Sequence, residues 1–183
     1  MDDKMTIMIV DDEKNILHAL KRTLNCQPDW KIETYSRSTD ALRHAQTTTY
    51  DLFLSDYRMP GMDGVQFLCE TKALQPEAMR LILSGHTDLK ALTKAINQAE
   101  IYRFISKPWE DYDLITTLAQ ALIHRDTLTE NRRLADQVRA QQQELDKRKL
   151  TLERLKDAHP TLFQVNWEAD GSVRLDEDDE RNA

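Results

Sequence analysis

Residues 6–20 read TIMIVDDEKNILHAL: an unbroken apolar run, a pair of acids, and then apolar residues at helical spacing. The same alternation repeats up to about residue 108. Strands buried on both faces read as nearly continuous apolar runs, and parallel strands need helical crossovers. The pattern therefore predicts an α/β fold with a five-stranded parallel sheet and helices on both faces. The expected strands are TIMIV at 6–10, WKIETY at 30–35, DLFLSD at 51–56, RLILSG at 80–85 and RFISKP at 103–108, and the expected helices span 14–24, 39–46, 63–74 and 89–99.

The 183 residues carry 25 Lys and Arg against 32 Asp and Glu, a net charge of −7. Because binding to a phosphate backbone depends on clustered cations and the sequence has no basic run, we expect no nucleic-acid partner. No apolar stretch approaches the length of about 18 residues that spans a bilayer, so we expect no membrane partner and a cytoplasmic location. Cys26 and Cys69 have no metal or redox spacing, which favours two reduced thiols.

Polar side chains follow the predicted strands where each one ends: Asp11 and Asp12, Asp56, Ser84 and Lys107. Ligands of an open parallel sheet gather at the carboxyl ends of its strands, so these groups should converge on one edge. Taken alone, the acidic pair before residues 14–24 is typical of a helix cap. Three carboxylates together would repel one another unless they shared a cation, and oxygen-only ligands suit Mg²⁺.

With these motifs, residues 6–122 resemble the receiver domain of two-component response regulators. The resemblance is carried by the segments IVDDEKNIL, LSDYRMPGMDG, LILSGH and FISKPW. It implies a flavodoxin-like fold and a cis peptide bond before Pro108. It also implies a Mg²⁺ site formed by Asp11, Asp12, Asp56 and the main-chain carbonyl of Arg58.

The resemblance further implies how these residues act. Asp56 would accept a phosphoryl group from a histidine kinase or a histidine phosphotransfer protein, while Lys107 neutralises the phosphoryl oxygens. Ser84 would follow the phosphoryl group, and Phe104 would swing inward with it. The lifetime of the phosphorylated form would be set by Arg58 and His86. Apart from Mg²⁺-dependent self-phosphorylation and autodephosphorylation, we expect no enzyme activity.

Residues from about 110 to 157 contain no Gly or Pro and predict one long helix. Its first third, up to Leu122, carries an apolar stripe that would complete the receiver domain. Beyond Leu128 the apolar residues fit the a and d positions of a heptad if Asn131, Gln141 and Arg148 share the same seam. This pattern predicts a weak coiled coil and a homodimer through the residues Leu134, Val138, Leu145, Leu152 and Leu155.

The C-terminal segment predicts a small β-hairpin and an acidic tail. Phe163, Val165 and Trp167 alternate up to Asp170–Gly171, a dipeptide that is typical of a two-residue hairpin turn. The last residues are strongly acidic and predict disorder. The expected organisation is a receiver domain at 1–124, an extended helix at 125–158, a hairpin at 159–176 and a disordered tail at 177–183.

About 60 residues after the receiver region cannot hold a separate catalytic core, so the output should be a contact with an unidentified protein. The leading hypothesis is a response regulator in which phosphorylation switches the coiled-coil and hairpin surface. Alternatives are a phosphate sink or phosphorelay carrier, a non-phosphorylated coiled-coil scaffold, and a phosphatase of the haloacid dehalogenase type. The last requires two Asp residues two positions apart after the first strand, which the adjacent pair Asp11–Asp12 does not provide.

Overall fold

A computed structural model describes residues 4–85 and 99–159 of the chain. The chain divides into two units, residues 1–131 and 132–183, and each is described by itself. Its elements are β1 (Met5–Val10), α1 (Lys14–Leu24), β2 (Trp30–Tyr35), α2 (Ser38–Ala45), β3 (Leu52–Asp56), α3 (Gly64–Leu74), β4 (Met79–Gly85), β5 (Arg103–Lys107) and α5 (Asp111–Ala158). The five predicted strands are confirmed. The helix expected at 89–99 lies almost entirely outside the described residues.

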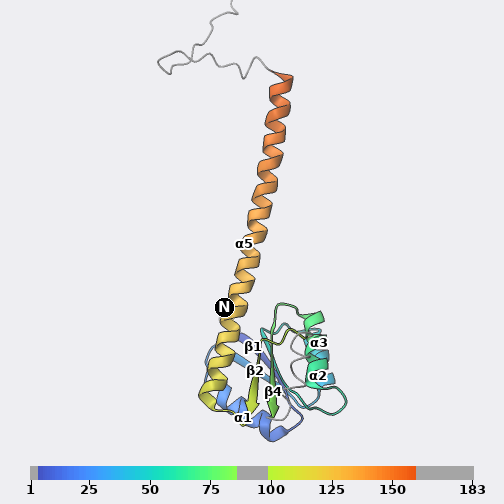
Figure 1. Cartoon of the computed structure of the whole chain (residues 1–183), viewed down its shortest axis with the longest axis vertical. Helices are drawn as coiled ribbons and strands as arrows, with labels where there is room; N and C mark the ends of the chain where they lie inside the picture. Colours follow the sequence, from blue (N-terminus) through green and yellow to red (C-terminus); the bar gives the residue numbers. More distant parts are fainter. Residues whose placement is uncertain (1–3, 86–98, 160–183) are drawn as a thin grey trace, which may run out of the picture. The chain divides into compact units, whose positions relative to one another are not determined.

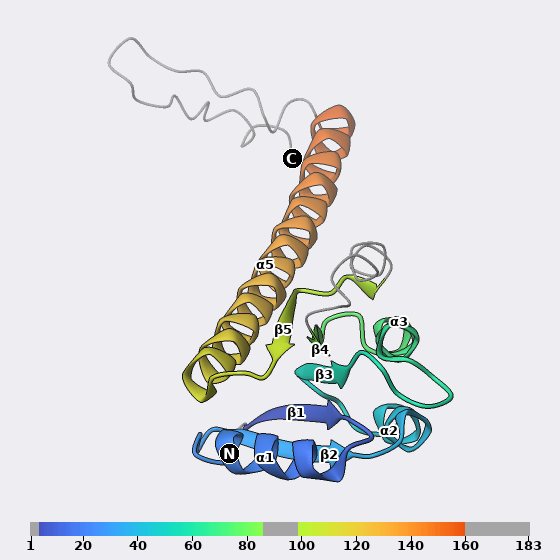
Figure 2. The ribbon, with the colours of Figure 1, turned by 60° about the horizontal axis from the view of Figure 1, so that its bottom comes forward.

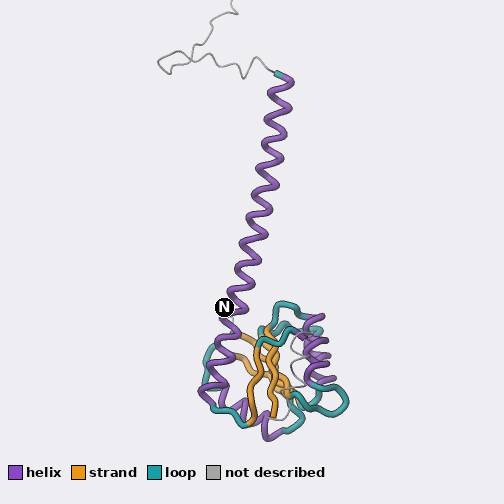
Figure 3. Tube along the Cα trace, viewed as in Figure 1, coloured by secondary structure: helices purple, strands orange, loops and turns teal. Residues whose placement is uncertain are grey.

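The five strands form one parallel sheet in the order β2-β1-β3-β4-β5, drawn as arrows in Figure 2 and in orange in Figure 3. The register brings the strand ends together, because Val10 pairs with Ser55 and Gly85 pairs with Lys107. The ends of β1, β3, β4 and β5 therefore share one edge of the sheet. This is the edge at which the sequence predicts the functional groups.

Helices cover both faces of the sheet, as predicted (Figure 2). Alternate strand residues point to opposite faces, so Ile7 and Ile9 belong to one core cluster while Met8 and Val10 belong to the other. The first cluster is closed by apolar residues of α1 and α5, and the second by residues of α2 and α3. The apolar stripe predicted at the start of the long helix is buried in the first cluster. Its buried residues are Leu114, Leu118, Ala121 and Leu122.

Helix α5 continues for 48 residues, from Asp111 to Ala158, and is the long helix predicted from the sequence (Figure 1). At a rise of 1.5 Å per residue it extends roughly 70 Å. Every described residue from Asn131 to His159 is exposed. The predicted hairpin and acidic tail lie outside the described residues except for His159, so they stay predictions, as does the division of the chain into four segments.

Candidate functional site

Asp11, Asp56 and Lys107 meet at the carboxyl edge of the sheet. The Lys107 Nζ lies 2.7 Å from Oδ2 of Asp11 and 2.5 Å from Oδ1 of Asp56. Asp11 is fully buried and Asp56 is 7% exposed, while the lysine side chain is 20% exposed. Side chains at the ends of β1, β3 and β5 are therefore joined by one ammonium group. Of the two carboxylates, that of Asp56 keeps some access to solvent.

The second oxygen of each carboxylate accepts a hydrogen bond from the main chain two residues further on. The amide of Glu13 donates to Oδ1 of Asp11 at 2.8 Å, and the amide of Arg58 donates to Oδ2 of Asp56 at 2.7 Å. These bonds fix both side chains by contacts with the loops that follow their strands. The acidic pair therefore does not cap α1 as an ordinary N-cap, since the cap residue is Glu13 and its side chain makes no capping bond.

The loop from β3 to α3 is held close beneath Asp56. The amide of Gly64 donates to the carbonyl of Tyr57 at 3.0 Å, and a Cβ atom on Gly64 would lie 1.9 Å from the carbonyl oxygen of Asp56. Only glycine permits this approach. The first turn of α3 then begins from Asp63, whose carboxylate accepts the amide of Gln66 at 2.8 Å. The contacts of the loop between β3 and α3 thus help to fix the position of Asp56.

Burial and pairing act in opposite directions on the charges of this site. Burial raises the pKa of Asp11, and the hydrogen bond from Lys107 compensates only in part, so the pKa stays above the usual value. For Lys107, burial lowers the pKa, but hydrogen bonds and charge from Asp11 and Asp56 outweigh burial and raise it. Lys107 is therefore positively charged, but its charge alone does not fully stabilise the buried carboxylate of Asp11.

Three more residues predicted for the site occupy different surroundings. Asp12 follows Asp11 but is exposed. Ser84, at the end of β4, is 4% exposed, and its hydroxyl donates to the carbonyl of Gly85 at 3.1 Å. Phe104 on β5 is 40% exposed. His86 lies outside the described residues, and the Lys107–Pro108 bond is cis, as expected.

The donor set of the site fits a divalent cation. Asp11, Asp12 and Asp56 carry three formal negative charges and Lys107 one positive charge, which leaves two negative charges at this edge. All available side-chain donors to a metal are oxygens, the preference of Mg²⁺, which commonly binds through one or two carboxylates and keeps several waters. Within residues 4–85 and 99–159, no three His, Cys, Asp or Glu side chains converge into a ready metal-binding group. A cation here would need main-chain or water oxygens as well.

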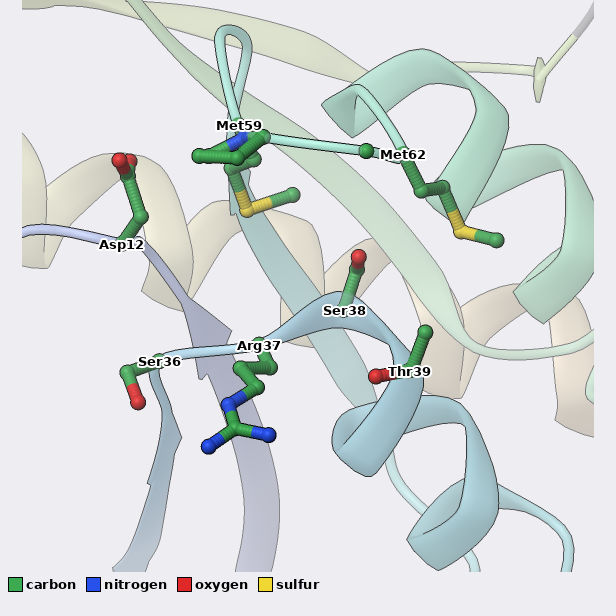
Figure 4. A pocket seen from close by; sticks show the side chains of 9 residues that line it. Asp12, Ser36, Arg37, Ser38, Thr39, Met59 and Met62 are labelled. Atoms are coloured by element: carbon green, nitrogen blue, oxygen red, sulfur yellow. The ribbon is translucent and has the colours of Figure 1, made fainter.

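A cavity of about 390 Å³ opens beside Asp12, and the sequence did not predict it (Figure 4). Its walls come from the loops that follow β1, β2 and β3 and from the first turn of α2. No function was predicted from the sequence for Met59, Pro60 and Gly61 or for the loop after β2. The lining consists of Asp12, Ser36, Arg37, Ser38, Thr39, Met59, Pro60, Gly61 and Met62. Strand β2 ends at the same sheet edge, which is the signal that points to Ser36.

The chain contains an α/β domain with a parallel sheet that is covered on both faces. At one edge of this sheet, two carboxylates share a lysine and form an acidic site. The family model of the response regulator receiver domain matches residues 7–119. The chain therefore belongs to the response regulator receiver family, whose domains accept phosphoryl groups in signalling. The match covers the sheet and the first part of α5.

Among curated relatives, the hydrogenase transcriptional regulatory protein HoxA of Cupriavidus necator is 37% identical over 121 residues, which are 66% of this chain and 25% of HoxA. The DNA-binding transcriptional regulator NtrC of Escherichia coli K12 is 30% identical over 118 residues, 64% of this chain and 25% of NtrC. The chain thus spans about a quarter of the length of these relatives. The similarity concerns their shared receiver region.

Two solved structures show the same fold. The signal receiver domain of an HD domain-containing protein from Pseudomonas fluorescens Pf-5 superposes with a TM-score of 0.64 at 36% identity, covering 68% of this chain and 98% of that one. An adenylate cyclase from Rhodopirellula baltica gives a TM-score of 0.68 at 27% identity, covering 73% of this chain and 98% of that one. In the part of the chain described here, none of the helices offers an apolar stretch long enough to cross a membrane.

Proposed function

We propose that this chain is a phosphorylation-dependent response regulator in which Asp56 accepts a phosphoryl group from a histidine kinase or a histidine phosphotransfer protein. The observation that supports this function best is the position of Asp56. The Asp56 carboxylate has limited access to solvent. The ammonium of Lys107 lies 2.5 Å from its Oδ1, and the main-chain amide of Arg58 lies 2.7 Å from its Oδ2. The lysine supplies positive charge where the equatorial phosphoryl oxygens would lie. This charge favours phosphoryl transfer to the Asp56 carboxylate.

In the proposed step, an oxygen of Asp56 attacks the phosphorus of a phosphohistidine in line. A P–O bond forms as the P–N bond breaks, and the imidazole nitrogen leaves with the bonding electron pair. The product is an acyl phosphate on Asp56. Water later attacks the same phosphorus, and the Asp56 carboxylate leaves with inorganic phosphate as the other product. Lys107 stabilises the phosphoryl oxygens in both steps.

Mg²⁺ is the cofactor that the donor set fits. Asp11, Asp12, Asp56 and the main-chain carbonyl of Arg58 would hold it. When bound, the ion supplies charge that neutralises the phosphoryl oxygens during transfer. Three carboxylates against one lysine support a need for positive charge beyond that of Lys107.

The switch would begin at Ser84, whose buried hydroxyl now donates to a neighbouring carbonyl. On phosphorylation this hydroxyl would turn to the phosphoryl group, and the half-exposed ring of Phe104 would move inward. The amide of Arg58 already contacts Asp56, which supports a part for this residue in setting the lifetime of the acyl phosphate. The same function for His86 stays a prediction.

The output would be a contact made through α5, which joins the receiver core to an exposed helical segment. A coiled-coil homodimer through this segment and a hairpin that docks an output protein complete the proposal. A phosphate sink or relay carrier differs by passing the phosphoryl group back to a phosphotransfer protein. A non-phosphorylated coiled-coil scaffold differs because it would not accept a phosphoryl group. The expectation that nucleic acid is not a partner stays a prediction.

The test is phosphoryl uptake on the full chain. With Mg²⁺ and phosphoramidate, one phosphoryl group should be gained, and Asp56→Asn should gain none. Beryllofluoride with Mg²⁺ should shift the amide NMR resonances around Asp11, Asp56 and Lys107. If the wild-type resonances at this edge do not move and no phosphoryl group is gained, the proposed function is wrong.

A further inference from the structure

We propose that residues 131–155 of α5 pair with the same residues of a second copy as a parallel, in-register coiled coil, with Asn131 facing Asn131. This inference deepens the proposed function, since it rests on α5 being the output element. It commits the exposed segment to one partner, another copy of this chain. It also assigns an orientation and a register to that pairing.

The first argument is the spacing of the apolar side chains on an exposed helix. Leu134, Val138, Leu145, Leu152 and Leu155 are between 44% and 64% exposed and follow the three-, four- and seven-residue steps of heptad positions a and d. The pattern persists for more than three heptads, the length at which it favours a coiled coil. Helices gain most of their stability by packing such a face, so this seam requires a partner.

The second argument is that the seam matches itself best in one arrangement. Asn131, Gln141 and Arg148 occupy the remaining a and d positions between the apolar residues. When two parallel copies align without offset, each apolar residue faces its own counterpart and each polar residue faces a polar one. A shift by one heptad places Leu134 against Gln141 instead. Only the in-register parallel pairing keeps all the apolar layers.

An antiparallel pairing keeps fewer of these layers, because a positions then face d positions. The arrangement that matches Leu134 with Leu145 also sets Val138 against Gln141 and Arg148 against Asn131. Apolar side chains would then be covered by amide groups. A single Asn at an a position is, moreover, the feature that fixes register in parallel two-stranded coils.

Charges beside the seam agree with the parallel arrangement. Glu144 occupies a g position and Lys149 the e position that lies next to it on the parallel partner, five residues further along. Glu144 already forms an ion pair with Arg148 of its own helix, at 3.1 Å. Glu144 can therefore compensate the charge of Lys149 on the second copy and that of Arg148 on its own helix. Arg148 is the one charged residue of the seam, and without this compensation it would face only the same arginine of the second copy.

Mutations at two equally exposed leucines test the seam. Leu145 is 51% exposed and lies in the seam, whereas Leu150 is 50% exposed and lies on the opposite side of the heptad. In sedimentation experiments on the full chain, Leu145→Glu should raise the dimer dissociation constant by at least about 100-fold, because two buried leucines are lost from one layer. Leu150→Glu should leave it unchanged. A monomeric wild type, or equal effects of the two variants, overturns the proposal.

Cysteine cross-linking tests the orientation in a Cys26→Ser, Cys69→Ala background. Arg148→Cys should form an interchain disulfide, since residue 148 faces its counterpart only in the parallel register. The control Lys147→Cys, on the outer side, should not. A disulfide that forms only when Asn131→Cys and Arg148→Cys chains are mixed would show an antiparallel dimer, and failure of Arg148→Cys to cross-link would overturn the register. Phosphoryl uptake at Asp56, measured on the same samples, reports separately on the proposed function.

Discussion

Arg125 of α5 and Asp51, which precedes β3, form an ion pair with Nη2 and Oδ1 2.9 Å apart. Their side chains are only 19% and 17% exposed, and the other oxygen of Asp51 accepts the amide of Thr6 at 2.6 Å. The pair joins residues 74 positions apart and ties the first third of α5 to the edge of the sheet opposite the candidate site. The long helix is therefore anchored on the receiver core by charge as well as by its apolar stripe.

We expect Asp51→Ala to lower the free energy of unfolding by about 2–4 kcal/mol, because it removes the carboxylate that pairs with Nη2 of Arg125 and accepts the main-chain amide of Thr6. Urea denaturation of the full chain measures this change. Asp126→Ala is the matched control, since Asp126 binds the same guanidinium at 3.2 Å but is 49% exposed. Its effect should stay below about 0.5 kcal/mol. Equal losses in the two variants would contradict the anchoring function of Asp51.

Replacing Lys107 by Ala should slow phosphoryl uptake from phosphoramidate by about 100-fold or more. The Lys107 ammonium lies 2.5 Å from Asp56, and losing one preorganised charge donor costs about this much in rate. Mass spectrometry over time measures the uptake. Lys31→Ala is the control, because that lysine pairs with Glu33 on β2 and is 57% exposed. An uptake rate that is unchanged without Lys107 would exclude it from the transfer step.

Two glycines close to Asp56 should respond differently to Ala. A Cβ at Gly64 meets the carbonyl oxygen of Asp56 at 1.9 Å, so Gly64→Ala must displace the loop and should cost about 3 kcal/mol or more of stability. Gly61 has open space around it but a φ of +82°, so Gly61→Ala should cost only the left-handed strain of about 1–2 kcal/mol. Denaturant unfolding ranks the two variants. The reverse ranking would contradict the close approach at Gly64.

Glu33 should make the stability of the protein depend on acid pH. Burial raises its pKa, but hydrogen bonds from Lys31 and Tyr50 outweigh burial, so the folded-state pKa lies below the ordinary value of 4.5. A lowered folded pKa stabilises the protein above about pH 4.5, and this contribution is lost as the pH falls through the folded pKa. Glu33→Gln should therefore have a flatter dependence of unfolding free energy on pH below 4.5. Parallel curves for the two proteins would show that Glu33 does not contribute.

The sequence was sufficient for the strands, the long helix and the position of polar residues at the ends of the strands. Residues 7–10 are apolar and buried because β1 is covered on both faces, and the exposed Asp12 marks the point where that burial ends. The same reasoning placed Asp56 and Lys107 at the ends of their strands. Such signals are local, since each depends only on the pattern of neighbouring residues.

The relationships between those residues depended on tertiary structure. Sequence spacing does not show that one lysine joins Asp11 to Asp56 while Asp12 stays exposed, nor that three loops and the start of α2 line a cavity beside Asp12. It also does not pair Arg125 with Asp51. Periodicity reports which side of a segment is buried, whereas the order and register of the strands decide which distant side chains meet. That order is set by packing of the whole sheet, and no single segment encodes it.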